Sequence, residues 1–456
     1  MNRLVIMLLL LPFLMEAQII TNWQTLPNAP FGSRINDASF IDEDYGWVVR
    51  GAGEGFRTTD GGDTWDVMLN SDSTFWRSVT FTNKNLGFAG NLGPDEYGGS
   101  QITDSNLIYR TSDGGENWAP IENISGETGK GVCGMHALDS LHIYAVGRVR
   151  GPSFFMKSTD GGISWTSKNM SFLSAGLVDV HFFTPDSGIA VGLSNSEHAL
   201  SSGVVLITSD GGSTWTQKYL SSRQGEWAWK ISFPSRNTGY ISLQRNVGEP
   251  VNFIKTTDGG NTWFEKQFFE TPYYVQGMGF ANDTLGWIGG NSSQTTYQTT
   301  DGGETWSPAN FGTRINRFYF VNELLGYAGG QTVYKYTGQV ATSIDDLVKP
   351  DGFSLSQNYP NPFNPTTKIK FTIPQLTPIE GGTNNGILYV TLKIYDTLGK
   401  EVMTVVDEQM SPGENQIEIY AGDLASGVYY YQLQAGDPSA GSGRGFIDSK
   451  KMIVVK

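Results

Sequence analysis

Short runs in which apolar and polar side chains alternate follow one another along most of the chain, and clusters of turn-forming residues separate them. In Val390–Tyr395 every second side chain is apolar, which is the pattern of a strand with one buried face. Similar runs fill residues 18–338 and residues 353–456, bounded by glycine, asparagine, aspartate and serine. This pattern predicts an all-β protein with many turns.

One turn motif occurs six times between residues 58 and 306. It consists of two Ser or Thr residues, Asp-Gly-Gly, two variable positions and a tryptophan. The aspartates of successive copies are separated by 53, 47, 50, 48 and 43 residues. Intervals of this length, filled with short strands, are typical of the four-stranded blades of a β-propeller. The aspartates and tryptophans of the six copies are Asp60, Asp113, Asp160, Asp210, Asp258, Asp301, Trp65, Trp118, Trp165, Trp215, Trp263 and Trp306.

A second motif, a phenylalanine followed six positions later by a glycine, precedes each turn motif and occurs once more after the last. In the third copy, which is degenerate, we assign the two positions to His136 and His142. The second motif therefore has seven copies where the first has six. The six regular pairs are Phe40/Gly46, Phe81/Gly87, Phe182/Gly188, Phe233/Gly239, Phe280/Gly286 and Phe320/Gly326.

The place where a seventh turn motif would stand can be located in the sequence. Val333–Thr337 aligns with the run before the sixth turn, but Gly338 stands where the aspartate belongs and no tryptophan follows. Near the other end of this region, Trp23 and its neighbours resemble the segment that follows a turn motif. We expect the N-terminal strand to supply the outer strand of the last blade, which closes a seven-bladed ring and removes free sheet edges.

The first 17 residues are typical of a secretory signal peptide. Arg3 precedes the apolar run Leu4–Leu14, and the small residue Ala17 marks an expected cleavage position. The run is shorter than the roughly 20 residues that span a bilayer, and no other stretch could cross one. The alternative is a buried core helix. We expect the mature chain to be soluble or attached to a surface.

Charge and composition exclude several functional classes. The chain has 31 Lys and Arg against 45 Asp and Glu, a net charge of −14, whereas nucleic-acid binding needs a basic face. One cysteine forms no internal disulfide, and four scattered histidines do not suggest zinc. We therefore expect neither a metal nor a cofactor. The acidic balance itself identifies no partner.

The six turns resemble the Asp-box, or bacterial neuraminidase repeat, at every defining position. With one box in each of six blades, residues 18–338 resemble the seven-bladed propellers of the photosystem II assembly and stability factor family. The same box occurs in sialidases, xyloglucanases and sortilin-type receptors, so the resemblance implies a fold rather than an activity. The aspartate can accept hydrogen bonds from its own turn, and the tryptophan can pack between sheets. We expect structural roles for the box residues, with calcium binding or catalysis as the alternative.

The last hundred residues carry a different set of motifs. Asn358–Pro365, Leu392–Gly399, Ser426–Tyr429 and a terminal Lys-Lys-apolar run resemble, in this order, the type A C-terminal sorting domain of the type IX secretion system. The resemblance implies a small immunoglobulin-like β-sandwich over residues 353–456, read by the outer-membrane translocon and its sorting machinery, after a linker at 339–352. It also implies that the mature chain passes through the periplasm and is secreted or held at the outer cell surface. A long loop, Ala435–Asp448, departs from the pattern. An ordinary accessory sandwich is the alternative.

We expect ligands on the propeller face opposite the boxes, because long insertions between second and third strands and long connections between blades lie there. These segments are 92–105, 148–153, 194–203, 244–251, 123–130 and 221–229.

A mixed row of residues stands nine positions before the motif glycines, near the expected channel mouth on that face. Charges of both signs in one ring are costly to bury unless they are paired or hydrated. The row either holds the channel together by ion pairs or forms a polar ligand site with the neighbouring Trp76, Arg77, Trp229 and His181. The members of the row are Asp37, Ser78, Cys133, Asp179, Lys230, Gly277 and Arg317.

Little in the sequence supports catalysis. The Arg-Ile-Pro mark of sialidases is approximated by Arg34-Ile35-Asn36, but the triplet recurs at Arg314, so repetition explains it. Hydrolysis by paired carboxylates stays open, although no spacing singles out a pair. We predict a secreted or cell-surface, non-catalytic propeller that binds or assembles a protein or glycan ligand. The alternative is a glycoside hydrolase, sialidase-like or other, acting on the loop-bearing face.

Overall fold

The computed structural model describes residues 19–94, 99–127, 129–245, 250–269, 273–290, 295–340, 353–373, 388–422, 424–436 and 446–456. The expected signal peptide, most of the expected linker and most of the loop 435–448 lie outside these residues. The chain divides into a propeller unit, Thr21–Gly338, and a separate unit that contains the C-terminal residues.

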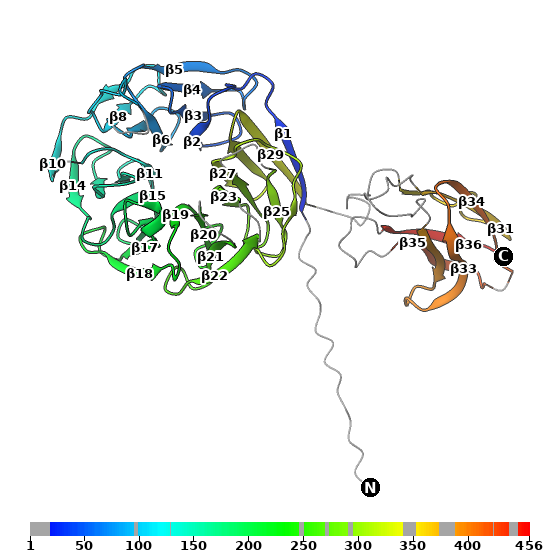
Figure 1. Ribbon diagram of the computed structural model, residues 1–456. Coiled ribbons are helices and arrows are strands. Elements are labelled where there is room, and N and C mark those ends of the chain that lie inside the picture. Colours follow the sequence, from blue (N-terminus) through cyan, green and yellow to red (C-terminus); the bar gives the residue numbers. More distant parts are fainter. Residues whose placement is uncertain are drawn as a thin grey trace, which may run out of the picture. The chain divides into compact units, whose positions relative to one another are not determined.

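The propeller unit is a ring of seven antiparallel blades (Figure 1). In the third blade, the short strand β10 (Ile124–Gly126) adds in parallel to the outer strand. Blades 1 to 3 contain β2 (Ile35–Phe40), β3 (Gly46–Arg50), β4 (Glu54–Thr58), β5 (Asp66–Asn70); β6 (Trp76–Phe81), β7 (Gly87–Asn91), β8 (Ile108–Thr111), β9 (Ala119–Pro120); and β11 (Gly134–Ala137), β12 (Ile143–Gly147), β13 (Phe154–Ser158), β14 (Trp165–Asn169). Blades 4 to 6 contain β15 (Gly176–Phe182), β16 (Gly188–Leu193), β17 (Gly203–Thr208), β18 (Thr216–Leu220); β19 (Glu226–Ser232), β20 (Gly239–Arg245), β21 (Val251–Thr256), β22 (Phe264–Phe269); and β23 (Val275–Phe280), β24 (Gly286–Gly290), β25 (Tyr297–Thr299), β26 (Ser307–Pro308). One short 3-10 helix, η1 (His198–Leu200), lies between β16 and β17.

The seventh blade joins the two ends of the propeller sequence. β27 (Arg317–Asn322), β28 (Leu325–Gly329) and β29 (Val333–Val340) are completed by β1 (Ile19–Thr25), which lies beside β29. The ring of Trp23 on β1 stacks on Phe311 with centroids 4.2 Å apart. The N-terminal strand therefore closes the ring, as the sequence predicted.

The spacing of the Phe/Gly motif follows from a contact across the first hairpin of each blade. Phe40 pairs with Gly46 in the β2–β3 register, and its ring lies where a Cβ on Gly46 would stand, 2.0 Å from the nearest ring atom. The other face of the Phe40 ring stacks on Tyr327 of the seventh blade at 3.5 Å between centroids. A glycine is needed because the aromatic ring that joins neighbouring blades occupies the space of its side chain.

The third blade corrects one assignment made from the sequence. Leu138 N–H bonds to the His142 carbonyl, and Ala137 pairs with Ile143, so these two residues take the Phe and Gly positions rather than His136 and His142. Gly134, which pairs with Val146, therefore replaces Cys133 in the row of channel residues. The alignment was wrong by one position because an Ala/Ile pair carries neither the aromatic ring nor the glycine of the motif.

The contacts of the Asp-box explain its composition. In the first copy, Asp60 Oδ1 accepts hydrogen bonds from the Thr64 N–H at 2.9 Å and the Thr58 hydroxyl at 2.8 Å, and Oδ2 accepts from the Thr64 hydroxyl. These bonds, led by the Thr64 hydroxyl, lower the pKa of Asp60 to about 2. Gly61 and Gly62 have φ of 73° and 100°, where other residues are strained. The carboxylate is thus occupied by donors of its own turn.

A cation just before several boxes links neighbouring blades, a feature that the sequence analysis did not identify. The Arg57 guanidinium donates to the Gly114 carbonyl of the next box at 3.3 Å, and Lys157 Nζ donates to the Gly211 carbonyl at 2.7 Å. Lys335 Nζ reaches the Gly61 carbonyl at 3.3 Å across the junction of the last and first blades. The same bond therefore repeats at the closure of the ring.

The C-terminal unit is a small immunoglobulin-like β-sandwich. A single core contains side chains from both of its sheets. Tyr431 in this core accepts a hydrogen bond from the Asn358 N–H at 2.8 Å and donates one to the Ser356 carbonyl at 2.8 Å, which fixes the start of the Asn358–Pro365 motif to the core. The strands are β30 (Ser354–Leu355), β31 (Thr366–Ile373) and β34 (Gly413–Tyr420) in one sheet, and β32 (Leu388–Tyr395), β33 (Glu401–Met410), β35 (Gly427–Ala435) and β36 (Phe446–Val454) in the other.

Candidate ligand-binding pocket

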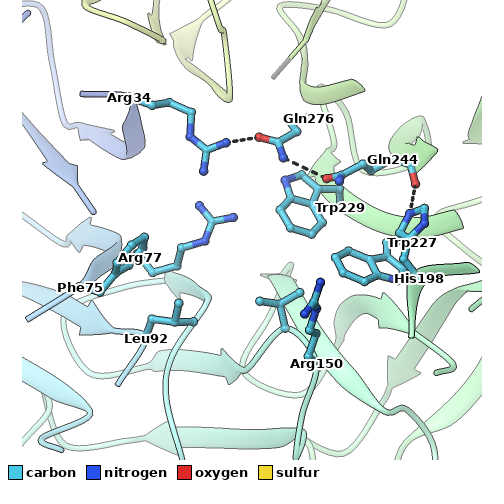
Figure 2. Close-up of a pocket in the computed structure, with 11 residues that line it drawn as sticks. Arg34, Phe75, Arg77, Leu92, Arg150, His198, Trp227, Trp229, Gln244 and Gln276 are labelled. Atoms are coloured by element: carbon cyan, nitrogen blue, oxygen red, sulfur yellow. Dashed lines mark hydrogen bonds between the residues drawn. The ribbon is translucent and has the colours of Figure 1, made fainter. Parts of the chain in front are cut away.

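A cavity of about 310 Å³ opens on the face that carries the long loops (Figure 2). Two groups of residues line it. One group lies in or just before the first strand of a blade, and the other lies at the end of the second strand or in the segment that follows it. Five of the six segments predicted from the sequence contribute, and only 123–130 does not. The lining residues are Arg34, Phe75, Arg77, Leu92, Val149, Arg150, His198, Trp227, Trp229, Gln244 and Gln276.

Aromatic side chains form much of the pocket wall. The indoles of Trp227 and Trp229 lie almost parallel, at 12° with centroids 5.8 Å apart. Their strand β19 begins at Glu226, whose fully buried carboxylate is held by Arg223 and Arg245, so the start of the strand is fixed in place. Because β19 carries a register irregularity between Ala228 and Ile231, its start does not follow a regular ladder.

A chain of polar side chains crosses the top of the pocket. Arg34 donates to Gln276 Oε1 at 2.5 Å, and Gln276 Nε2 donates to Gln244 Oε1 at 3.0 Å. The His198 ring lies 3.3 Å from the Gln244 carbonyl oxygen and packs edge-on against Trp227. Partial burial lowers the pKa of His198, which favours its neutral form. The amides are thus held in fixed orientations before any ligand binds.

Arg77 is the most unusual group in the pocket. Only 4% of its surface is exposed, and its buried Nη1 has no hydrogen-bond partner among the described residues. Its guanidinium lies 5.5 Å from the ring centre of Trp229, a cation–π contact. Burial, and then repulsion from Arg77 and Arg314, lower the pKa of nearby Arg34 to about 9. No carboxylate is among the eleven lining residues, so the charged side chains of the lining are all arginines, although the protein as a whole is acidic.

The mixed charges of the channel row lie beside this pocket and form a compact cluster. Arg317 Nε is 3.0 Å from Asp37 Oδ1, and Arg317 Nη1 is 2.9 Å from Asp179 Oδ2. Burial alone would raise the pKa of Asp179, but Arg317, Lys230 and the Ile231 N–H together hold it below the ordinary value. Burial lowers the pKa of Lys230 to about 8, against the opposing effect of Asp179. The geometry favours the first interpretation of this row, ion pairing across the channel.

Two histidines lie deeper in the channel. His181 is two residues beyond Asp179 on β15, and its ring lies 4.6 Å from that of His136 between centroids. Burial is the largest influence on both, and it lowers the pKa of His181 to about 4 and that of His136 well below its ordinary value. Both rings are therefore neutral at physiological pH.

Of the seven ligand-binding residues proposed from the sequence, two line the pocket, Arg77 and Trp229. Asp37, Asp179, Lys230 and Arg317 form the channel cluster, and His181 lies below it. Trp76, named beside the site, instead donates its indole N–H to the Gly53 carbonyl at 3.0 Å. The lining residues that the sequence analysis did not single out as ligand contacts include Arg34, Phe75, Trp227 and Gln276. These four residues could have been found from their position in the repeat, because each stands ten or twelve residues before the glycine of the Phe/Gly motif.

Two negative findings concern the part of the chain that the structure describes. It contains no group of three or more His, Cys, Asp or Glu side chains placed to hold a metal ion. None of its helices has both the length and the apolar character that a membrane span requires.

Fold and comparisons together define an exported β-propeller with a C-terminal sorting domain. Residues 357–442 match the family described as a secretion system C-terminal sorting domain. That domain directs export through the corresponding secretion system, to the cell surface or beyond, and implies contact with its machinery.

The propeller is similar to photosystem II assembly proteins. It is 26% identical over 233 residues to the photosystem II assembly lipoprotein Ycf48 of Synechococcus sp., a match that spans 51% of this chain and 61% of that relative. A structure described as YCF48 bound to D1 peptide covers 70% of this chain and 96% of its own, at 18% identity and a TM-score of 0.51. An inactive virginiamycin B lyase from Staphylococcus aureus with quinupristin covers 70% and 99%, at 10% identity and a TM-score of 0.52. At these identities the structures share the fold alone.

Proposed function

We propose that this chain is a non-catalytic binding module, secreted or held at the cell surface, whose ligand enters the pocket on the loop-bearing face. The observation that carries the proposal is the lining of that pocket. Two parallel indoles, oriented amides and arginines provide contact area and hydrogen bonds, which is what recognition requires. The ligand is a protein or glycan outside the cell, because the sorting domain directs export.

The composition of the pocket also bears on the alternative, a glycoside hydrolase. Hydrolysis of a glycosidic bond ordinarily needs two carboxyl groups about 5–10 Å apart, one on each side of the bond. The lining includes none, and the nearby carboxylates of Asp37 and Asp179 are engaged by Arg317. The relatives named as assembly proteins agree with a binding role, and a peptide is the ligand named in the YCF48 structure.

The test is a screen for binding and turnover with the same protein. The mature full-length chain is applied to glycan and peptide arrays, and each bound ligand is then incubated with it and examined by mass spectrometry. We expect binding that leaves the mass of the ligand unchanged. Release of a reducing sugar or a shortened product would contradict the proposal, and so would the absence of any binding that depends on the pocket.

Two variants of matched chemistry locate the binding. Trp229→Ala removes one wall of the pocket, whereas Trp263→Ala removes an indole from a box on the opposite face. Binding lost in the first and retained in the second places the ligand on the loop-bearing face. The reverse result would place it at the boxes.

A further inference from the structure

Three buried donors among the lining residues have no hydrogen-bond partner among the described residues. They are Arg77 Nη1 and the indole Nε1 atoms of Trp227 and Trp229. Figure 2 shows the Trp229 indole below Gln276 and to the right of the Arg77 guanidinium. A buried donor without a partner costs free energy, more so when it is charged, so these groups indicate that an acceptor-bearing group completes the site.

The guanidinium of Arg77 favours a planar anion as the ligand group. A guanidinium presents its N–H groups as a fork that matches a carboxylate. Arg34 stands nearby, oriented by Gln276 and by Asn36, so a second guanidinium already adds its charge to the same region. No lining residue is acidic, so none competes for these cations within the pocket.

The remaining surfaces favour a ring with hydroxyl groups beside that carboxylate. The Trp227 and Trp229 indoles offer flat apolar area, on which the C–H face of a saturated ring can pack. Gln276 makes one bond through each of its two amide atoms, which leaves one lone pair and one N–H available for hydroxyl groups.

The balance of donors and acceptors distinguishes a sugar from a polypeptide end. A peptide brings backbone N–H donors, for which this lining of arginines and indoles provides few acceptors. A sugar hydroxyl can accept as well as donate and so can satisfy the indole N–H. The cavity, about 310 Å³ and bounded by residues of six blades, suits a compact terminal residue rather than a continuous chain.

We propose that the pocket recognises a carboxylated sugar residue, such as a uronic acid at the end of a glycan, with its carboxylate on Arg77 and its ring on the indoles. This inference rests on the proposed function, since it names the ligand class of the same site. It makes the arginines the source of specificity for acidic over neutral sugars.

The test compares ligands that differ only in the carboxylate. Glucuronate and glucose, and galacturonate and galactose, are titrated into the mature full-length chain and followed by saturation-transfer NMR and by tryptophan fluorescence. We expect the acids to bind at least about tenfold more tightly than the neutral sugars, the difference that one charge-assisted hydrogen bond provides. Equal binding of acid and neutral sugar would overturn the proposal.

Two variants test whether Arg77 binds the carboxylate of the sugar. Arg77→Gln removes the guanidinium whose Nη1 has no partner among the described residues, and it is expected to weaken glucuronate binding at least about tenfold and to abolish most of the preference for glucuronate over glucose. Arg110→Gln, on the box face where Arg110 bonds to the Gly161 carbonyl, is the control and is expected to bind as the wild type does. Unfolding followed by tryptophan fluorescence shows that each variant is folded. Wild-type affinity in folded Arg77→Gln would overturn the assignment.

A third set of probes separates this inference from the proposed function. Hexapeptides that end in phenylalanine are supplied with a free or an amidated C-terminus. Peptide binding that needs the free carboxylate, with no binding of either uronate, would overturn the sugar assignment and leave the binding module standing. If array ligands bind and none depends on Arg77 or Trp229, the proposed function fails together with the inference.

Discussion

Replacing Arg317 with methionine tests whether the channel cluster holds the ring together. The variant retains a side chain of similar length but leaves Asp37 and Asp179, which are 3% and 2% exposed, without the cation that lies about 3 Å from each. Removing one partner of a buried ion pair typically costs about 3–5 kcal/mol. Lys230 stays nearby and Arg317 is itself partly exposed, so we expect a loss of about 3 kcal/mol.

That loss converts into a shift of the unfolding temperature. A propeller unit of about 320 residues has an unfolding entropy of roughly 0.7 kcal/mol/K, so the shift is about 4–5 °C. All 12 tryptophans precede residue 339, so tryptophan fluorescence reports on the propeller alone. Lys218→Met, at an exposed position of β18, is the control and is expected to change the midpoint by less than 1 °C.

The pH dependence of the Arg317→Met defect provides a second check. Without the cation, burial raises the pKa of the Asp179 carboxyl group in the folded state above its unfolded value. The folded variant then binds more protons than the unfolded chain, so its stability falls as pH rises. The defect is therefore larger at pH 8 than at pH 5. A variant as stable as the wild type, or a defect that grows towards acid pH, would refute the structural role of the cluster.

Three further predictions follow from other parts of the propeller. The pKa values of His136 and His181 lie below 6.5 in the folded state, so between about pH 6.5 and 4 only the unfolded chain binds their protons, and stability falls as the pH is lowered. In fluorescence melts, His181→Phe makes the dependence of stability on pH less steep, and an unchanged dependence would contradict the assignment. Trp23→Ala removes the indole that stacks at the closing blade and lowers stability by about 3 kcal/mol, measured by urea unfolding; a loss below about 1 kcal/mol would mean that β1 does not hold the ring closed. Because N–H and O–H donors occupy the box carboxylates, EDTA leaves the melting temperature unchanged, and a fall that calcium restores would contradict this account.

The repeat could be recognised in the sequence because the residues of its motifs contact one another in the fold. Phe40 must lie over a residue without a side chain and against Tyr327, so the Phe/Gly spacing persists wherever the contact does. In the third blade the contact uses Ala137 and Ile143, and the alignment slipped by one residue there. A motif thus identifies a blade only where the packing that produces it is kept.

The pocket could be predicted only in part. Arg77 and Trp229 were identified because they adjoin the row of charged channel residues. Arg34 was set aside because Arg314 repeats its triplet, yet only Arg34 lines the cavity. His198 reaches the pocket from the segment between β16 and β17, whose path no repeat determines, and Gln244 lies near the end of β20. Repetition describes the scaffold, whereas a binding site depends on where the copies differ.

The most direct measurement of the central claim uses the tryptophans as reporters. The mature chain is labelled with 5-fluorotryptophan, and its ¹⁹F NMR spectrum is followed as the strongest array ligand is added, with the ligand recovered afterwards for mass analysis. The account predicts that the resonances of Trp227 and Trp229 shift, that those of the box tryptophans such as Trp263 do not, and that the ligand is recovered intact. Shifts confined to the box tryptophans, or a ligand recovered in cleaved form, would contradict it.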